Sequence, residues 1–385
     1  MMIAGEASGD LHGSSLALAL RELEPGVKLI GMGGDKMVEA GLQSFQDIQE
    51  LSVIGFLEVL SNLKKFKAAF NTLVEKLASE RPDCVVLIDY PEFNLRFAKE
   101  AKKRGIPVVY YISPQIWAWR KGRVKTVKKF VDKMIVVLGF EKDFYAKEGV
   151  EVEFVGHPLL DSVRPVFKKN EFLRENGLDP AFKTIALLPG SRLTEVERNL
   201  PIMLKAAKRI KDRFGDSQFI LAKPAEIKAS VYEKILKRAP LKPAVAEGYP
   251  YDCINAAELV IVASGTATIE TAILEKPMLI IYKVSFLTWL IGKMLVKIPN
   301  IGLVNIIAGE GIVPELIQFD ATPSKIASEA SSLLSSPEKM KAMQLRLAAV
   351  KAKLGEAGAS RRAAQIILGT SPLKDKIRRE VLSDG

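Results

Sequence analysis

The stretch Leu259–Glu270, LVIVASGTATIE, passes from an uncharged apolar run through small residues into a segment with helical periodicity. Apolar runs of this length, without alternating polar residues, are typical of strands buried on both faces of a parallel sheet. The small residues at 263–266 suit the turn that joins such a strand to the next helix. The stretch therefore predicts one strand–turn–helix unit of a parallel sheet covered by helices.

The same alternation extends in both directions along the 385-residue chain. We predict strands at Val27–Gly31, Cys84–Ile88, Ile106–Tyr111, Met134–Leu138, Val152–Val155, Thr184–Leu188, Gln218–Ala222, Pro243–Ala246, Leu259–Val262 and Met278–Tyr282. We predict helices between them, for example at Phe56–Leu77, Phe93–Arg104, Leu200–Phe214 and Thr266–Leu274. Two such series in one chain predict an α/β fold with two Rossmann-like, doubly wound domains.

The break between the two series lies near residues 160–173, where a charged segment separates them. We predict a first domain at 1–165, a second at 166–345 and a C-terminal helical region at 346–385. Ligands of open parallel sheets bind beyond the carboxyl ends of the strands. Two such domains therefore predict a site in a central cleft between them.

The composition excludes several classes of protein. Hydrophobic residues make up 48% of the chain, which suits a folded core, and two cysteines do not make a disulfide framework. With two histidines, we expect no metal site. The first residues lack a signal-peptide pattern and the apolar stretches are too short to span a membrane, which predicts a cytoplasmic protein.

The net charge of +11 favours an anionic partner, such as a phosphorylated metabolite, a nucleic acid or an anionic lipid leaflet. Seven lysines and arginines lie within residues 120–133. This cluster is either the solvated face of a helix or an electrostatic docking site for phosphate groups.

The first polar motif is Gly5–Gly13, GEASGDLHG, ahead of a predicted helix at Ser14–Glu22. A loop of small residues lets backbone N–H groups at a helix start contact an anion or a sugar hydroxyl. Ser8, Gly9 and Asp10 are therefore candidate substrate-binding residues. The alternative is a plain turn in which Ser8 or Asp10 caps the helix.

The second motif places Asp89 directly after the apolar strand Cys84–Ile88. A carboxylate at the carboxyl end of a strand can remove a proton from an attacking hydroxyl, which makes Asp89 the candidate catalytic base. The alternative is that Asp89 caps the helix that begins near Phe93.

A third motif, Tyr111–Arg120 or YISPQIWAWR, leads from another strand into the basic cluster. Aromatic faces beside cations suit an acceptor substrate that is apolar, sugar-like or phosphorylated. Packing of Trp117 or Trp119 in the core is the alternative. The candidate substrate-binding residues in this motif are Tyr111, Ser113, Trp119 and Arg120.

Two further turns suit phosphate groups. Ser191 and Arg192 follow the strand at 184–188, and Ser264, Gly265 and Thr266 follow the strand at 259–262. A guanidinium and backbone N–H groups at helix starts are typical of diphosphate binding. Glu270 lies one turn along the second helix, where it can accept hydrogen bonds from ribose hydroxyls. No Asp-x-Asp motif occurs, so Arg192 and the helix starts would stabilise the leaving diphosphate.

Together these strings resemble the lipid-A-disaccharide synthase family, in order and at natural spacing up to about Gly311. The strings are GEASGDLHG, YISPQIWAWR, FVGHP at Phe154–Pro158, LLPGSR at Leu187–Arg192, ASGTA at Ala263–Ala267 and NIIAG at Asn305–Gly309. The resemblance implies a GT-B-like fold and an inverting transfer of 2,3-diacylglucosamine from UDP. The acceptor would be the 6-hydroxyl of 2,3-diacylglucosamine 1-phosphate, and the products a β-1,6 disaccharide 1-phosphate and UDP.

The resemblance also implies roles for residues. It makes Asp89 the base, matches Ser191, Arg192 and Ser264–Thr266 to the UDP phosphates, and matches Glu270 to the ribose. It places Asn305 near the donor and His157 at the crossover between domains.

From the missing Asp-x-Asp motif and the two histidines we expect no cofactor and no metal. The resemblance further implies that the partners are the two lipid substrates and the inner leaflet of the cytoplasmic membrane. It suggests peripheral association and a homodimer. Segments at 56–60 and 286–291, each followed by lysines, read as amphipathic helices that either lie on a membrane or face the core.

Two other functions fit part of the pattern. A UDP-sugar epimerase can share the two-domain fold but would not depend on a second sugar. A basic nucleic-acid-binding protein would fit the charge, but no zinc-finger, RRM or KH signature occurs, so we expect no nucleic-acid partner.

Overall fold

The computed structural model describes residues 1–47, 59–118, 121–225, 227–286, 289–290 and 299–370. Contacts divide the chain into two compact units, one of Met1–Leu160 with the chain from Leu354 onward, and one of Asp161–Lys353. This division differs from the predicted 1–165, 166–345 and 346–385. The last described helix belongs to the first unit and is not a separate tail.

The first unit is built on a sheet in the order β3-β2-β1-β4-β5-β6-β7, and every pairing between its described strands is parallel. Its strands are β1 (Met2–Ala4), β2 (Ile30–Gly33), β3 (Gln43–Asp47), β4 (Val85–Ile88), β5 (Val108–Tyr111), β6 (Lys133–Val136) and β7 (Val152–Phe154).

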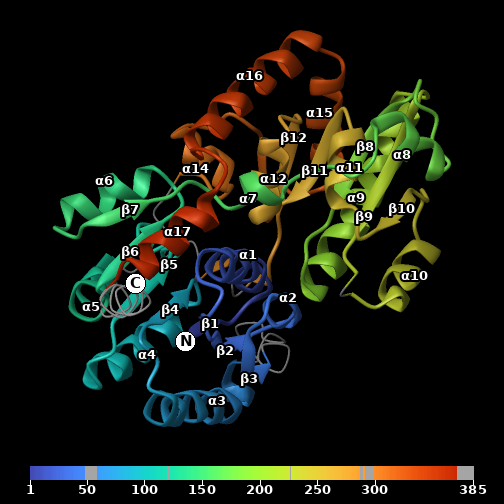
Figure 1. The fold of residues 1–385 in the computed structure, drawn as a ribbon. Coiled ribbons are helices and arrows are strands. Elements are labelled where there is room, and N and C mark those ends of the chain that lie inside the picture. Colours follow the sequence, from blue (N-terminus) through green and yellow to red (C-terminus); the bar gives the residue numbers. More distant parts are fainter. Residues whose placement is uncertain (48–58, 119–120, 226, 287–288, 291–298, 371–385) are drawn as a thin grey trace. The chain divides into compact units, whose positions relative to one another are not determined.

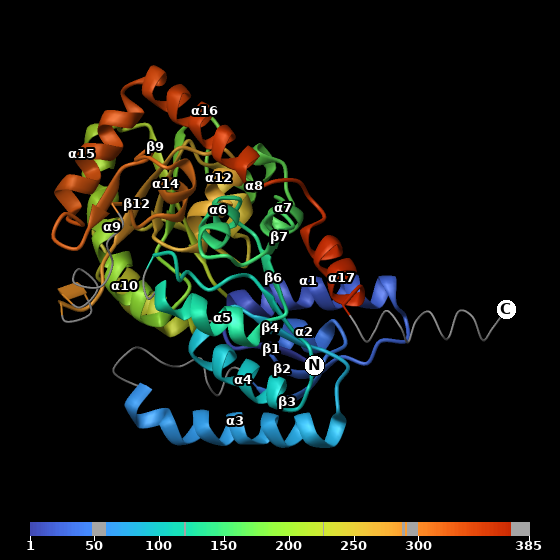
Figure 2. The ribbon, with the colours of Figure 1, turned by 90° about the vertical axis from the view of Figure 1, so that its left-hand side faces the viewer.

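Helices cover both faces of this sheet. Figures 1 and 2 show α1 and α17 side by side on one side of it, with α3 and α4 on the other. The helices of the unit are α1 (Ala7–Leu23), α2 (Asp35–Glu39), α3 (Val59–Glu80), α4 (Pro91–Lys103), α5 (Val124–Phe130), α6 (Phe140–Lys147) and α17 (Ala359–Leu368), with the short 3-10 helix η1 at Lys121–Arg123.

An aromatic layer joins α3, α4 and the end of β4. Phe93 and Phe97 lie one turn apart on α4, and both rings contact Phe70 of α3 with centroids 5.3 and 6.0 Å away. The Tyr90 ring, just after β4, stacks on Phe93 at 5.7 Å and on Phe66 at 6.4 Å. The hydrophobic core therefore reaches the carboxyl edge of the sheet beside Asp89.

The second unit repeats the design with a sheet in the order β10-β9-β8-β11-β12-β13, and its described pairings are also parallel. Its strands are β8 (Lys183–Leu188), β9 (Ser217–Lys223), β10 (Ala244–Glu247), β11 (Leu259–Ala263), β12 (Met278–Tyr282) and β13 (Glu315–Ile317).

The helices of the second unit pack on one another as well as on the sheet. Helix α9 contacts α15 and α10, while α12 contacts α11, α14 and α16. They are α8 (Lys169–Glu175), α9 (Leu193–Arg213), α10 (Ala229–Lys237), α11 (Pro250–Ala256), α12 (Thr266–Ile273), α14 (Leu303–Ala308), α15 (Pro323–Leu334) and α16 (Pro337–Lys353); α7 (Leu159–Ser162) spans the boundary between the units.

The ten predicted strands are confirmed with shifts at their ends, as are two doubly wound α/β units. Strands β1, β3 and β13 were not among the ten: β1 has only three residues, and the short sequences of β3 and β13 contain polar residues and no long apolar run. The cleft predicted between the two units stays a prediction. In the described part of the chain, no helix is both long and apolar enough to span a membrane.

Candidate functional site at the strand switch points

Each sheet has one point where the chain turns from one side of the sheet to the other. In the first unit β1 and β4 are neighbours there, and in the second unit β8 and β11. The loops that follow such a pair leave in opposite directions and open a crevice at the carboxyl edge. Asp89 follows β4, Arg192 lies beyond β8, and Ser264–Thr266 follow β11. The predicted catalytic and phosphate residues thus stand at the two switch points.

Asp89 occupies a strained turn at the end of β4. Its φ is 46° and that of Tyr90 is 49°, so two consecutive non-glycine residues are left-handed. The Asp89 carbonyl accepts a 2.7 Å hydrogen bond from Asn94 Nδ2 and another from the Tyr110 hydroxyl. Its N–H donates to the Tyr111 carbonyl at 3.2 Å.

Burial raises the pKa of the Asp89 carboxyl to about 7, and the nearby Glu6 carboxylate adds to this effect. Part of the residue still reaches the surface. A carboxyl with this pKa holds or releases a proton near neutral pH, which suits a general base. Glu6 was not among the predicted site residues, because its charge acts only once the fold brings it beside Asp89.

The predicted glycine loop is mostly helix. Helix α1 begins at Ala7, so Ser8 and Gly9 lie in its first turn and not in a loop ahead of Ser14. Gly9 is buried, and a Cβ there would lie 3.3 Å from the Ala4 Cβ. This glycine therefore lets α1 pack closely on β1, whereas Ser8 stays half-exposed and remains a candidate.

Asp10 has a structural role, and its contact with substrate stays a prediction. Its carboxylate accepts hydrogen bonds from the backbone N–H groups of Gly34 at 2.8 Å, Lys36 at 3.2 Å and Met37 at 3.0 Å. The side chain is 6% exposed. Asp10 thus caps the start of α2 from the neighbouring helix, satisfying N–H groups that would otherwise lack partners.

The motif after β5 is also largely internal. Tyr111 is fully buried, and Ser113 is 5% exposed with its hydroxyl 2.8 Å from that of Tyr145. The Trp117 indole donates to Glu141 at 3.2 Å and packs edge-on to Phe140. These contacts favour the core-packing alternative for Trp117. Trp119 and Arg120 lie outside the described residues.

Glu141 is a buried carboxyl that sequence reasoning missed. It lies in the first turn of α6, is 1% exposed and accepts from Leu138 N at 3.2 Å as well as from Trp117. Burial raises its pKa to about 8. Nothing in its sequence context distinguishes it from an ordinary acidic residue in a first helical turn, so only the fold reveals it.

The two histidines form a buried pair. His12 of α1 and His157 after β7 contact edge to face with centroids 6.1 Å apart. Burial lowers the pKa of His12 to about 4 and that of His157 to about 3. His157 Nδ1 accepts from Leu159 N at 3.2 Å, and the backbone N–H of His157 donates to the Leu354 carbonyl at 2.8 Å. Both rings are therefore neutral near pH 7, and a substrate contact of His157 stays a prediction.

In the second unit, a carboxylate of α9 bonds to backbone N–H groups at the start of the same helix. The Glu195 carboxylate accepts from the N–H groups of Ser191 at 3.1 Å and Arg192 at 3.3 Å. Gly190 has φ 123°, and a Cβ there would lie 2.4 Å from a Glu195 oxygen. Ser191 and Arg192 are exposed. A negatively charged group therefore already stabilises the N–H groups that the prediction assigns to phosphate.

The turn before α12 is open. Gly265 has φ 154° and ψ −160°, a conformation that is essentially restricted to glycine, and a Cβ there would meet nothing within 4 Å. Thr268 is fully buried and donates to the Gly265 carbonyl at 2.8 Å. Ser264, Gly265 and Thr266 are half-exposed, which fits their prediction as phosphate contacts.

Glu270 is half-buried on α12 and accepts a 3.3 Å hydrogen bond from the Tyr251 hydroxyl. Tyr251, on α11, was not predicted. Since the phenol holds one carboxylate oxygen, it orients Glu270, whose ribose contact stays a prediction.

Asn305 is held by hydrogen bonds within the second unit. Its side chain is fully buried, with Nδ2 donating to Val313 O at 3.0 Å and to Glu315 at 2.7 Å. Its Oδ1 accepts from Ile312 N and Val313 N. With these internal bonds Asn305 secures the chain before β13, and its place near the donor stays a prediction.

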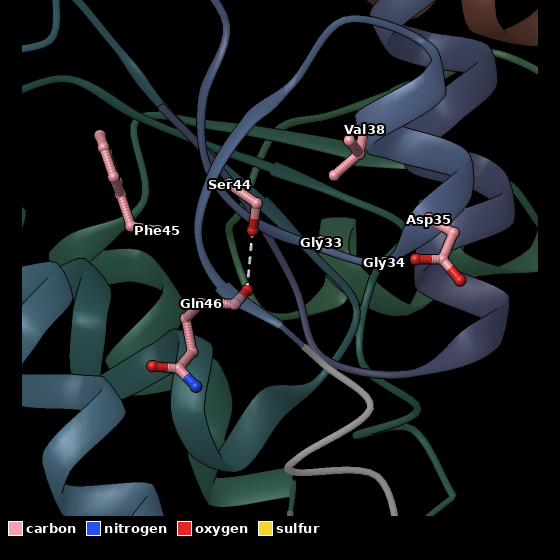
Figure 3. Close-up of a pocket in the computed structure, with 7 residues that line it drawn as sticks. All are labelled: Gly33, Gly34, Asp35, Val38, Ser44, Phe45 and Gln46. Atoms are coloured by element: carbon pink, nitrogen blue, oxygen red, sulfur yellow. Dashed lines mark hydrogen bonds between the residues drawn. The ribbon is translucent and has the colours of Figure 1, made fainter.

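A pocket of about 420 Å³ lies at the carboxyl end of β2 and along β3 (Figure 3). Figure 3 shows Asp35 and Gln46 on different sides of it and the Ser44 hydroxyl bonded to the Gln46 carbonyl. It contains none of the predicted site residues. Its lining is Gly33, Gly34, Asp35, Val38, Ser44, Phe45 and Gln46.

Known proteins share both the fold and the sequence of this chain. The glycotransferase of kitacinnamycin superposes with TM-score 0.64 at 16% identity, covering 95% of this chain and 97% of that chain. A UDP-GlcNAc 2-epimerase from Neisseria meningitidis, solved bound to UDP-GlcNAc, gives 0.63 at 14% identity, covering 94% and 98%. At these identities the likeness shows the fold alone.

Two parallel α/β units with polar turns at their switch points define a protein of the GT-B class. The family model described as lipid-A-disaccharide synthetase matches residues 1–368. The lipid-A-disaccharide synthase of Syntrophus aciditrophicus is 46% identical over 369 residues, covering 96% of both chains. The chain belongs to the lipid-A-disaccharide synthase family and is a glycosyltransferase of lipid A synthesis.

Proposed function

We propose that this enzyme transfers 2,3-diacylglucosamine from UDP to the 6-hydroxyl of 2,3-diacylglucosamine 1-phosphate, with inversion at the anomeric carbon. The observation that carries the proposal is the Asp89 carboxyl, which stands at the switch point of the first sheet with a pKa of about 7. Such a group suits removal of a proton from a sugar hydroxyl at neutral pH.

The reaction is a single displacement. The acceptor 6-oxygen forms a bond to the anomeric carbon while the bond from that carbon to the diphosphate oxygen breaks. The electron pair of the broken bond leaves with UDP, and the proton of the acceptor hydroxyl passes to Asp89. The product is the β-1,6 disaccharide 1-phosphate.

We assign the diphosphate to the starts of α9 and α12 in the second unit. Arg192 supplies a guanidinium, and the turn at Ser264–Thr266 supplies hydroxyl and N–H donors at a positive helix end. The Glu195 carboxylate now bonded at Ser191 and Arg192 would have to yield those donors to phosphate. Because these groups neutralise the leaving charge, we propose that the reaction needs no metal and no cofactor.

We also propose that the enzyme is peripheral to the inner membrane, where both lipid substrates reside. An aromatic cluster of the second unit supports this. Phe286 and Phe319 are 61% and 63% exposed, and the Trp289 ring lies 5.9 Å from the first and 5.1 Å from the second. Exposed aromatic side chains of this kind bind the interface of a bilayer.

The segment predicted at 286–291 falls only partly within the described residues, and residues 56–58 of the other lie outside them. Sedimentation with anionic vesicles tests the membrane proposal: the wild type should sediment and Phe286→Ser with Phe319→Ser should sediment less. A homodimer, proposed from the family, is tested by the mass of the protein in solution.

The reaction itself is tested by mass spectrometry of products from purified protein, with UDP-2,3-diacylglucosamine and 2,3-diacylglucosamine 1-phosphate. We expect a disaccharide 1-phosphate and UDP, and unchanged turnover with a metal chelator. A product isomeric with the donor, formed without the acceptor, would instead identify an epimerase. Loss of turnover with the chelator would contradict the metal-independent mechanism alone.

A further inference from the structure

The turn that carries Asp89 is an unusual feature of the first sheet. Asp89 and Tyr90 are both left-handed, although neither is a glycine or an asparagine. Each such residue is strained, and the strain persists only where surrounding contacts hold the backbone. The structure shows which contacts hold it.

Two fully buried side chains donate hydrogen bonds to the Asp89 carbonyl. Asn94, fully buried in the first turn of α4, places Nδ2 2.7 Å from the Asp89 oxygen and 3.2 Å from the Ile88 oxygen. Tyr110, fully buried on β5, donates its hydroxyl to the Asp89 oxygen. The peptide that follows Asp89 is therefore fixed from the helix and from the adjacent strand.

The residues on either side are fixed as well. The Asp89 N–H donates to Tyr111 O, and the Tyr90 ring lies between Phe66 and Phe93. A Cβ on Gly5 would lie 2.2 Å from the Tyr90 ring, so the chain after β1 presses against that ring. With the backbone held on all sides, the direction in which the Asp89 carboxyl leaves the chain is determined.

We propose that Asn94 and Tyr110 are positioning residues for the general base: by clamping the left-handed Asp89 carbonyl, they keep its carboxyl enclosed and oriented for proton removal. The inference rests on the proposed function of Asp89. It assigns a catalytic consequence to two residues whose side chains are fully buried.

The clamp predicts a change in pH dependence. When it is loosened, water reaches the carboxyl, and the burial that raises its pKa is partly lost. Because the base acts when deprotonated, the acid limb of kcat/KM moves to lower pH. The variants leave the other charged and titratable groups near the clamp unchanged. These are Glu6 after β1, the Tyr90 phenol, Tyr145 of α6 and Arg123 of η1, which pairs with Glu92.

Tyr110→Phe is the sharpest test, since it removes one hydroxyl and keeps the ring. We expect kcat to fall by about 10-fold to 100-fold, as for a misplaced catalytic group. We expect KM for the UDP-sugar to be unchanged and the acid limb to shift to lower pH. Asn94→Ala should act in the same directions and more strongly. The matched control is Tyr232→Phe, which removes the hydroxyl of a tyrosine that is 2% exposed in the second unit.

The outcomes separate this inference from the proposed function. If Asp89→Asn abolishes turnover while Tyr110→Phe and Asn94→Ala keep both the kcat and the acid limb of the wild type, the clamp is wrong and the base assignment stands. If the two variants only lower the melting temperature, as Tyr232→Phe would, their role is structural and the inference fails. Wild-type turnover by Asp89→Asn would defeat the base assignment and the clamp with it.

Discussion

At the scale of single residues, the chemistry depends on burial of titratable groups. Asp89 and Glu141 have pKa values raised by burial to about 7 and about 8, whereas those of His12 and His157 are lowered to about 4 and about 3. Each group is thereby biased toward its uncharged form. The protonation of these four groups of the first unit therefore differs between the folded and the unfolded chain.

The first prediction concerns the pH dependence of catalysis. Since Asp89 must be deprotonated to accept a proton, kcat/KM should rise with pH up to about 7 and then level off. Glu6→Gln removes the neighbouring negative charge, so the pKa of Asp89 should fall and the acid limb should move to lower pH. The pH profile of both proteins checks this; coincident limbs would mean that Glu6 does not act on the base.

The second prediction concerns stability. His12 is neutral in the folded chain down to about pH 4 but protonates near its ordinary value of 6.5 when unfolded. The unfolded state thus binds more protons, and this contribution to stability, present above about pH 6.5, is lost as pH falls. The free energy of unfolding of the wild type relative to His12→Gln should drop by about 2 kcal/mol from pH 7 to pH 5. Urea unfolding of both proteins at the two pH values measures the difference; a constant difference would contradict it.

The position of Asp89 was predictable from sequence, because a polar residue directly after an apolar run must lie at a strand end. The structural contacts of Asp10 and Asn305 were not predictable from sequence. Both are polar residues in recognisable strings, but their partners lie on other elements: Asp10 caps α2, and Asn305 bonds Val313 and Glu315. A sequence motif marks a required residue without showing whether it contacts ligand or holds the fold.

At the scale of elements, the starts of α9 and α12 differ in a way that bears on UDP binding. Helix α9 is capped by its own Glu195, whereas Gly265 before α12 leaves an open turn. Small-residue turns at these strand ends were predicted from their spacing. The hydrogen bonds of the Glu195 carboxylate at the start of α9 were not predicted, because they depend on the side-chain conformation of Glu195.

The third prediction tests the open turn. Gly265→Ala meets no atom but forces a side chain into a backbone region that disfavours it, at a cost of about 1–3 kcal/mol. We expect weaker UDP binding, measured by calorimetry, because the turn must change shape. The matched control is Gly177→Ala, at φ 69° with nothing within 4 Å, which should lose stability but keep UDP affinity. Equal UDP affinity in both variants would remove this turn from the site.

At the scale of the whole molecule, the first unit is formed by two separate segments of the chain. After the second unit ends at Lys353, helix α17 packs against α1, and Arg362 donates from Nε and Nη2 to the Val155 carbonyl at 2.9 and 2.6 Å. The sequence predicted a helix-rich end but not this return, because an amphipathic helix fits either unit and only distant contacts select one. The two parallel sheets, in contrast, follow from local apolar runs.

The fourth prediction tests this return. Arg362 also donates to the carbonyls of Glu356 and Ala357, so Arg362→Ala leaves several acceptors without a partner. We expect a loss of about 1–3 kcal/mol in the stability of the first unit. Arg361→Ala, which breaks only an exposed ion pair with Glu22, should cost less than about 1 kcal/mol. Denaturant unfolding compares the two, and equal losses would show that α17 is not held by the Arg362 bonds.

The most direct test of the central claim is the turnover number of Asp89→Asn with both lipid substrates in excess. The replacement is close in size and cannot accept the proton from the acceptor hydroxyl. We predict a fall in turnover of about 10²–10⁴ with UDP binding retained, as expected for loss of a general base. Turnover near that of the wild type would show that Asp89 is not the base.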